Sequence, residues 1–307
     1  GSIARTFVKT ALPIVFLTSM NGLLTVVDAV FLGVFVGADG LTAVTLMFPI
    51  SMLLVALATM VSTGMASELG RVIGAGDLDA ARRSFAGAHG LSILMSVVVI
   101  LLFAAVGWPV VTLIASGSPT LAAMGHLFLA ISILTSPVAF LLAIHSDALR
   151  TEGRVGFMAI AGLLVSVANM AFNYGLIVWL GLGVAGSAAG TALAQALALA
   201  VILLFRGSGK TRLTLGLRDT QNWRSGWSKI LALGAPRSLS FIGIALASAA
   251  TILALRWFSI GNQDAAIAAY GVIFRIMTLA FFPLLGMALA MRAMVGNNQG
   301  AGPWQRS

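Results

Sequence analysis

Residues 84–146 read SFAGAHGLSILMSVVVILLFAAVGWPVVTLIASGSPTLAAMGHLFLAISILTSPVAFLLAIHS, a run of 63 residues without Asp, Glu, Lys or Arg. A helix needs about 20 apolar residues to cross the hydrocarbon core of a bilayer, so this run is long enough for two spans. The polar stretch Ser116-Gly117-Ser118-Pro119 divides it. Lipid offers no partners to the backbone of an open strand, so the stretch predicts membrane-spanning helices.

The composition of the whole chain agrees with this prediction. Of the 307 residues, 59% are hydrophobic and 9% are charged, whereas a soluble domain carries about 25% charged residues. So few charges cannot cover the surface of a soluble enzyme, and so much apolar side chain excludes a disordered chain. Cysteine is absent, which excludes disulfides and thiolate chemistry within these residues.

The same charge-free criterion predicts an all-α polytopic membrane protein with eight transmembrane helices in this chain. They cover about residues 10–33, 40–67, two spans within 84–146, two within 155–205, and then 230–258 and 265–296. Connections rich in Lys and Arg follow the second, fourth and sixth spans, while the alternate connections at 34–39, 115–120 and 181–184 contain neither. Cytoplasmic loops are enriched in basic residues, so both ends of the chain are predicted to be cytoplasmic. This bias also accounts for the net charge of +9 without a nucleic-acid partner.

The chain also repeats itself. Met65, Gly70 and Gly74-Ala75-Gly76 recur 226 positions later as Met291, Gly296 and Gly300-Ala301-Gly302, and Pro13 recurs as Pro236. A repeat of six spans gives two lobes of the same orientation, the parallel-repeat plan of some secondary transporters. We therefore predict a first six-helix lobe (residues 1–205), a basic, solvated cytoplasmic linker (206–229) and the first two helices of a second lobe (230–307). Together these are eight helices of twelve, and a natural eight-helix protein is the alternative.

Polar residues inside the spans predict a functional site. Asp28 is an acidic residue well inside a span, where a charge costs about 2.5–3.5 kcal/mol and normally faces a cavity with a function. Three stripes at helical spacing accompany it: Asn21, Thr25 and Asp28; Ser166, Asn169 and Asn173; and Ser187, Thr191 and Gln195. They predict a hydrated cleft. Its carboxylate, amide and hydroxyl oxygens suit H+ or Na+ equally, and the alternative is that these groups only hold helices together.

Several motifs resemble the multidrug and toxic-compound extrusion (MATE) family of cation-coupled antiporters. They are Ala11-Leu12-Pro13, Val27-Asp28-Ala29-Val30-Phe31-Leu32-Gly33, Gly74-Ala75-Gly76-Asp77, Leu180-Gly181-Leu182-Gly183-Val184-Ala185-Gly186 and Gly300-Ala301-Gly302. The resemblance covers essentially the whole chain and implies a first lobe, a linker and a third of a second lobe. One branch of the family has an acid in helix one. Resemblance to that branch implies that Asp28, Asn169, Asn173 and Thr191 form a cation-coupling site in this chain. Some members have a second Asp where this chain has Asn173.

The expected function is secondary-active efflux of cationic or amphipathic compounds in exchange for H+ or Na+. The expected location is the bacterial inner membrane, with the lipid bilayer and small organic substrates as partners and no obligate protein partner. No cofactor, metal site or enzyme activity is expected. The alternatives are a lipid-linked saccharide flippase, disfavoured because the first-lobe spans lack basic residues, and an inactive truncated fragment.

Two further features stay open at this stage. Arg275 lies about ten residues inside the last span, where it could snorkel, pair with a later helix or meet an anionic substrate. His89, His126 and His145 lie near predicted helix ends without the spacing of metal ligands.

Overall fold

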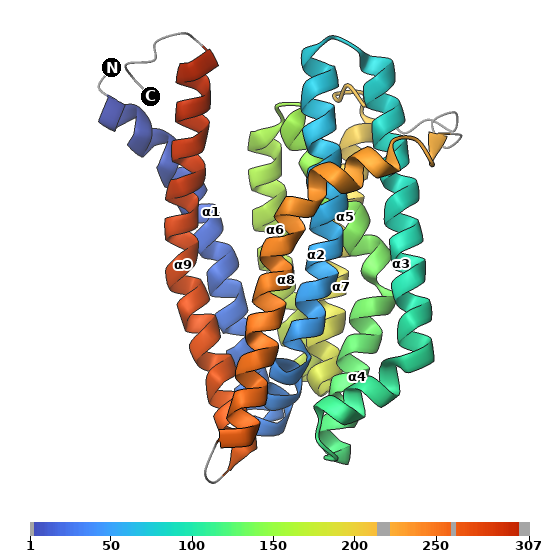
Figure 1. The fold of residues 1–307 in the computed structure, drawn as a ribbon. Helices are drawn as coiled ribbons and strands as arrows, with labels where there is room; N and C mark the ends of the chain where they lie inside the picture. The colour runs from blue at the N-terminus through green and yellow to red at the C-terminus, as the bar shows by residue number, and fades with distance from the viewer. Residues whose placement is uncertain (1–2, 214–221, 259–261, 301–307) are drawn as a thin grey trace.

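The computed structural model describes residues 3–213, 222–258 and 262–300, and the regular elements within them are helices (Figure 1). In chain order they are α1 (Ile3–Phe31), the π-helical turn η1 (Leu32–Val36), α2 (Ala38–Gly74), α3 (Leu78–Ile114), α4 (Pro119–Leu134), α5 (Ser136–Thr151), α6 (Val155–Asn173), the π-helical turn η2 (Tyr174–Trp179), α7 (Gly183–Gly207), α8 (Trp227–Phe258) and α9 (Gln263–Gly300).

Local sequence explains where the helices begin and end. Ser118 caps α4 by accepting a bond from the backbone N–H of Leu121 at 3.4 Å, and Pro119 follows at the first helical position. The break between α4 and α5 falls at Thr135, two residues before Pro137, because proline has no N–H for the continuing helix. The two halves are bent by 48° there.

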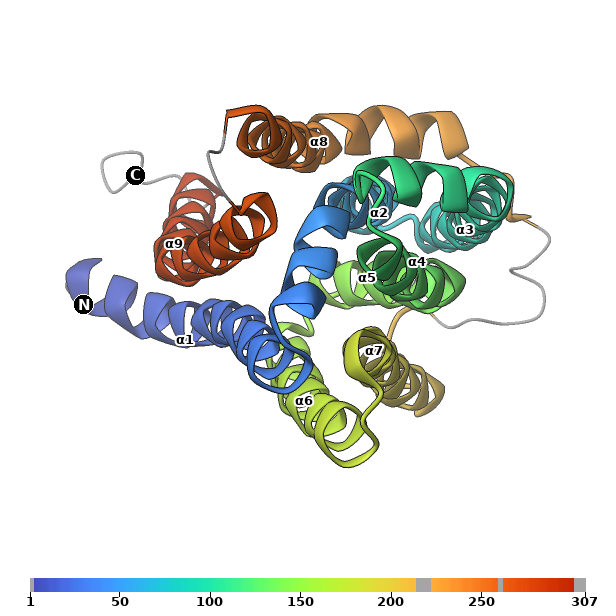
Figure 2. The same ribbon diagram turned by 90° about the horizontal axis from the view of Figure 1, so that it is seen from below.

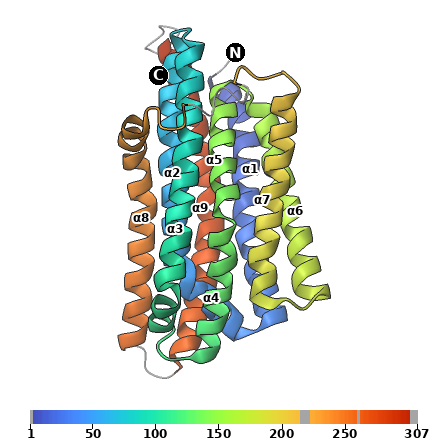
Figure 3. The ribbon, with the colours of Figure 1, turned by 90° about the vertical axis from the view of Figure 1, so that its right-hand side faces the viewer.

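The helices run roughly alongside one another in a bundle (Figures 1 and 3). Seen from one end, α8 lies along α2 and α9 lies beside α1 (Figure 2). Two buried apolar clusters fill the space around α2, one that includes Met65, Phe85 and Ile230 and one that includes Met47, Leu129 and Ile252. Helix α8 contributes Ile230 to the first cluster and Ile252 to the second. It therefore packs against the earlier helices near both of its ends.

The outer surface of the bundle is apolar. Large side chains such as Leu101, Leu113 and Leu246 are more than 60% exposed, as expected for helices that face lipid rather than water. Six described helices are long and apolar enough to cross a membrane, and α4 with α5 forms a seventh candidate. In α1 the apolar segment is shorter, Gly22–Val36. The all-helical membrane architecture is confirmed, and the count of eight spans stays a prediction.

The basic linker begins differently from the prediction. The sequence places Arg206 in a solvated segment, but this residue is 3% exposed, and its Nη1 donates to Glu152 Oε1 at 2.8 Å. The same Nη1 donates to the backbone carbonyl of Leu213 at 2.8 Å. A guanidinium leaves water only when its charge and donors are matched, and here an acid on the α5–α6 turn matches them. The first part of the connection therefore packs onto the preceding helices.

Candidate functional site

A chain of hydrogen-bonded side chains joins α1, α6 and α7. Asn173 Nδ2 donates to Asp28 Oδ1 at 2.6 Å and to Asn169 Oδ1 at 3.1 Å. Asn169 Nδ2 donates to Thr191 Oγ1 at 3.0 Å, and Thr191 Oγ1 donates to the backbone carbonyl of Ser187 at 3.1 Å. The structure therefore brings together the four residues predicted as one site, and Asp28 and Asn173 are 145 positions apart in sequence.

Both helices that meet at the carboxylate change their winding just beyond it. Asp28 lies one turn before the π-helical turn η1, and Asn173 is the last α-helical residue before η2. Such π-helical turns are rare and are often found at functional sites. After η1 the chain reverses at Gly37, whose φ of 95° is in the region that favours glycine.

The amide of Asn173 is fully buried and only partly satisfied. Asn173 is 0% exposed and Asn169 is 2% exposed. Both Nδ2 protons of Asn173 are used, but its Oδ1 has no hydrogen-bond partner among the described residues. An unmet buried acceptor beside a carboxyl group is a place where a bound proton or cation finds an additional oxygen.

Gly190 makes room for this amide, and sequence reasoning misses it. A Cβ at Gly190 would collide with Asn173 Oδ1. Any side chain there would push α7 away from α6 and lengthen the bond between Asn169 and Thr191. The available signal is its position next to Thr191, but a chain with 34 glycines hides one such residue.

The other predicted cleft residues lie on the same three helices as the hydrogen-bonded side chains. Thr25 Oγ1 donates to the carbonyl of Gly22 at 2.7 Å, within its own helix. Ser166 is buried and donates to Gly162 O at 3.1 Å, also within its own helix. Gln195 is half-buried on α7, two turns beyond Ser187. The side chain of Asn21 lies outside the part of the chain whose side chains the structure describes.

Arg275 brings a positive charge toward the site from α9. It is half-buried, and its Nη1 lies 3.4 Å from the carbonyl of Gly271. Arg275 and Asp28 each experience the other's charge. Among the described residues these two side chains form no ion pair within 4.0 Å, so Arg275 acts on the carboxyl group as a nearby positive charge and not as a bonded partner.

Two of the three histidines form a buried pair away from this site. His89 Nε2 lies 3.1 Å from His145 Nε2, and His89 Nδ1 lies 2.7 Å from the carbonyl of Phe85. Because Phe85 O only accepts, His89 donates through Nδ1 and accepts from His145 through Nε2. His126 instead stacks on Phe103, with ring centroids 5.0 Å apart. Among the described residues, no group of three or more His, Cys, Asp or Glu side chains could hold a metal.

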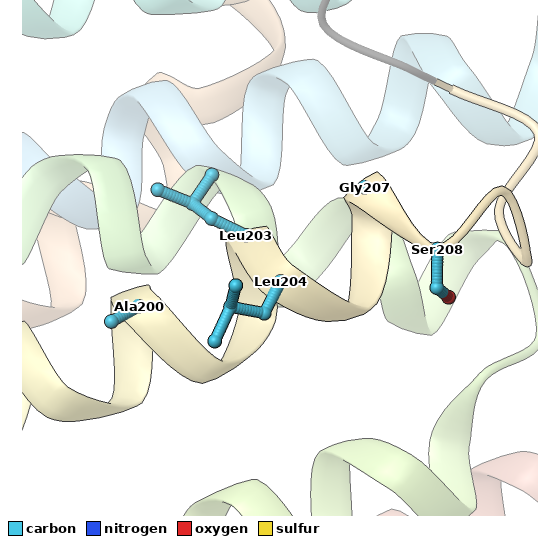
Figure 4. A pocket seen from close by; sticks show the side chains of 5 residues that line it. All are labelled: Ala200, Leu203, Leu204, Gly207 and Ser208. Carbon is cyan, nitrogen blue, oxygen red and sulfur yellow. The ribbon is translucent and has the colours of Figure 1, made fainter.

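A separate hollow lies on the surface of α7 near its C-terminal end (Figure 4). Its lining is mostly apolar and comes from α7 and the residue that caps it: Ala200, Leu203, Leu204, Gly207 and Ser208. None of the polar residues of the chain around Asp28 contributes to it. This hollow is therefore a surface feature of a lipid-facing helix and not part of the candidate site.

Comparison with known proteins gives consistent matches. The sequence model of the MatE family matches residues 13–175, just over half of the chain. "Multidrug and toxin extrusion protein 1" of Danio rerio is 29% identical over 200 residues, which cover 62% of this chain and 32% of that protein. The "FAD transporter" of Shewanella oneidensis is 23% identical over 282 residues, which cover 88% of this chain and 60% of that protein.

A solved structure supports the fold. It is a structure of the MATE multidrug transporter DinF-BH in complex with a ligand, and it superposes with a TM-score of 0.86 at 24% identity. The superposition covers 99% of this chain and 68% of that one. The matched regions span 32% and 60% of the length of the two curated relatives, so the match is to a part of each.

Proposed function

Because the chain belongs to the MatE family, we propose that the whole protein is a secondary-active efflux transporter and not an enzyme. It exports cationic or amphipathic organic compounds in exchange for H+ or Na+. Relatives named as multidrug and toxin extrusion proteins support the substrate class. The observation that carries the ion coupling is the intramembrane carboxyl of Asp28, bonded at 2.6 Å to a fully buried amide.

The amide of Asn173 can serve both charge states of Asp28. A carboxylate only accepts hydrogen bonds, so the amide presents its N–H group to it, as in the structure. A protonated carboxyl donates, and an amide turned about its last bond presents Oδ1 instead. For Na+, the carboxylate and the amide oxygens are suitable hard ligands. The ion therefore changes the bonding of α1 to α6 and α7 at one point.

The proposed architecture is two six-helix lobes of twelve helices in all, related as parallel repeats, that expose a central cleft alternately to each side of the membrane. In the structure, α1 begins and α9 ends at the same end of the bundle as the connection after α7 (Figures 1 and 3). This end carries the basic connections, which supports a cytoplasmic location for both ends of the chain. We place the protein in the bacterial plasma membrane.

A second candidate is a carrier of an anionic compound. One relative is named an FAD transporter, and α9 contributes the half-buried Arg275, to which an anion could bind. The nearby acid Asp28 argues against this candidate, because its charge reduces the positive potential that an anion would meet at Arg275.

The test is transport by the full-length protein in proteoliposomes. Uptake of a fluorescent lipophilic cation is measured under an imposed pH gradient or an imposed Na+ gradient, with FAD as a second substrate. We expect one of the two gradients to drive uptake and Asp28→Asn to abolish it. Asp39→Asn is the matched control, because Asp39 is an exposed acid in the first turn of α2 and should leave transport unchanged.

The outcomes separate the candidates. Gradient-driven transport that persists in Asp28→Asn would contradict the assignment of the coupling site. Transport of FAD without the lipophilic cation would favour the anion carrier. Folded protein that moves neither substrate under either gradient would favour a lipid-linked saccharide flippase or an inactive protein.

A further inference from the structure

The helices α1 and α9 lie side by side (Figure 2) and run antiparallel (Figure 1), and their contacts indicate the register between them. Gly22 of α1 lies so close to α9 that a Cβ there would stand 2.9 Å from Phe282 Cδ2 and 3.0 Å from Leu279 Cα. Two turns further along α1, Ala29 belongs to one buried cluster with Leu41 of α2 and Ala268 of α9. The part of α9 between residues 268 and 282 therefore faces the part of α1 between residues 29 and 22.

Arg275 lies in the middle of this contact face. It is midway in sequence between Ala268 and Phe282, two helical turns from each, and residues at that spacing lie on the same face of a helix. Helical side chains point toward the N-terminus of their helix. Here Nη1 lies 3.4 Å from the carbonyl of Gly271, one turn toward Ala268. This places the guanidinium near the level of the cluster that contains Ala268 and Ala29, the residue that follows Asp28.

The surroundings of Asp28 leave Arg275 as its charged neighbour. From α6 and α7 the described side chains that complete the polar chain are neutral: Asn173, Asn169 and Thr191. The ring of Tyr174 lies tilted against the ring of Phe31, with ring centroids 6.2 Å apart. The hydrogen bond of Arg275 within the described residues is a long one to its own helix, so its remaining donors are available to a carboxylate.

We propose that Arg275 is the counter-charge of Asp28 across the lobe boundary and acts as a positioning residue for ion coupling. The charged carboxylate attracts the guanidinium and holds α9 against α1. A bound proton or Na+ cancels this attraction and lets the second-lobe helix move. The proposal rests on the proposed function, since it needs Asp28 to take up the coupling ion.

The test measures the distance between the two helices as the pH changes. Spin labels are attached at Leu23→Cys on α1 and Ile276→Cys on α9, both exposed positions. The 307 residues contain no cysteine, so these are the only labels in this part of the full-length protein. We expect the distance to increase as the pH falls through the titration of Asp28.

The variants separate a charge effect from a structural one. A positive neighbour favours the carboxylate, so in Arg275→Gln the midpoint of the distance change should move to higher pH by about one unit or more. Arg275→Lys should restore the wild-type midpoint. Arg275→Met should behave like Arg275→Gln and replaces it if the Gln variant does not fold. Arg237→Gln on α8 is the control, because this arginine lies over the ring of Phe241 and should leave the midpoint unchanged.

The results that would overturn the proposal are distinct from those that would overturn the function. An unchanged midpoint in Arg275→Gln and Arg275→Met, or an equal shift in Arg237→Gln, would refute the role of Arg275 alone. In Asp28→Asn the distance should not respond to pH, and adding Arg275→Gln should have no further effect. If Na+ is the coupling ion, the same variants are titrated with Na+, and loss of Arg275 should increase the apparent affinity about tenfold. Ion-driven transport that survives in Asp28→Asn would instead refute the proposed function.

Discussion

Replacement of Arg206 by methionine should destabilise the protein far more than replacement of an exposed arginine. Arg206 is 3% exposed, and the side chain of its partner Glu152 is 1% exposed. Without the guanidinium, the carboxylate of Glu152 stays buried with only the backbone N–H groups of Arg212 and Leu213, at 2.8 and 3.3 Å. Removing one partner of a buried pair costs about 3–5 kcal/mol. We expect Arg206→Met to lower the free energy of unfolding by that amount.

The matched control is Arg82→Met. Arg82 pairs with Asp79 at 3.3 Å, but the two side chains are 45% and 77% exposed, so this pair contributes about 0–1 kcal/mol. Unfolding in mixed micelles with increasing SDS, followed by tryptophan fluorescence, measures both variants. A double variant, Glu152→Gln with Arg206→Met, removes both charges and should be more stable than Arg206→Met alone. If Arg206→Met and Arg82→Met differ by less than about 1 kcal/mol, the buried pair does not hold the connection as argued.

Three further substitutions test the packing around the site and along α8. Gly190→Ala should reduce ion-driven transport severalfold, because the added Cβ collides with Asn173 Oδ1, and the proteoliposome assay measures this. Thr191→Val should lower the free energy of unfolding in SDS by about 1–3 kcal/mol, because it leaves the buried Nδ2 of Asn169 without its acceptor. Gly64→Ala should lower the thermal unfolding temperature in detergent, because a Cβ there would collide with a backbone carbonyl of α8. Wild-type values in these assays would contradict the close contacts described above.

The membrane architecture could be predicted from sequence because lipid imposes a simple rule. Charge-free runs must become helices, and the breaks between them fall at Gly, Ser and Pro residues that favour turns. The predicted division at 116–119 coincides with the capped start of α4 at Ser118. The division at Gly181 coincides with the turn between η2 and α7, where Gly181 and the first residue of α7, Gly183, have φ values of 63° and 54°.

The centre of the candidate site could also be predicted, because helical periodicity places Asn169 and Asn173 on one face of their helix. Periodicity shows which residues share a face, but it does not show which helix that face meets. The meeting of Asn173 with Asp28 therefore follows only from the family resemblance. The placement of Gly190 against the amide depends on the distance between α6 and α7, which no spacing in the sequence encodes.

The buried pairs near the α5–α6 turn escape prediction for the same reason. Arg206 and Glu152 are 54 positions apart, and His89 and His145 are 56 positions apart. In the sequence, Arg206 begins a run of basic residues, and such runs are usually solvated. Its burial follows from the carboxylate that the fold places next to it, and the sequence alone does not identify that partner.

The position of the polar chain limits how ion binding can be coupled to transport. Asp28, Asn169, Asn173 and Thr191 all come from α1, α6 and α7, which would move together as parts of one lobe. A ligand shifts a conformational equilibrium only if it binds the two states with different affinity. A site built from one lobe alone would bind the ion equally well in both states, so a group from the other lobe has to change its contact with the site. In the proposed two-lobe architecture, Arg275 on α9 would be such a group.

The strength of a single charge pair is sufficient for this role. Moving a two-state equilibrium from 1:99 to 99:1 needs about 5.5 kcal/mol of differential binding. Opposite charges about 4 Å apart attract by about 4 kcal/mol at an effective dielectric constant of about 20. An Asp–Arg contact of that length, made in one state and lost in the other, would supply most of the required difference. The neutral amides within the lobe orient the carboxylate, and the charge on α9 makes its ion binding depend on conformation.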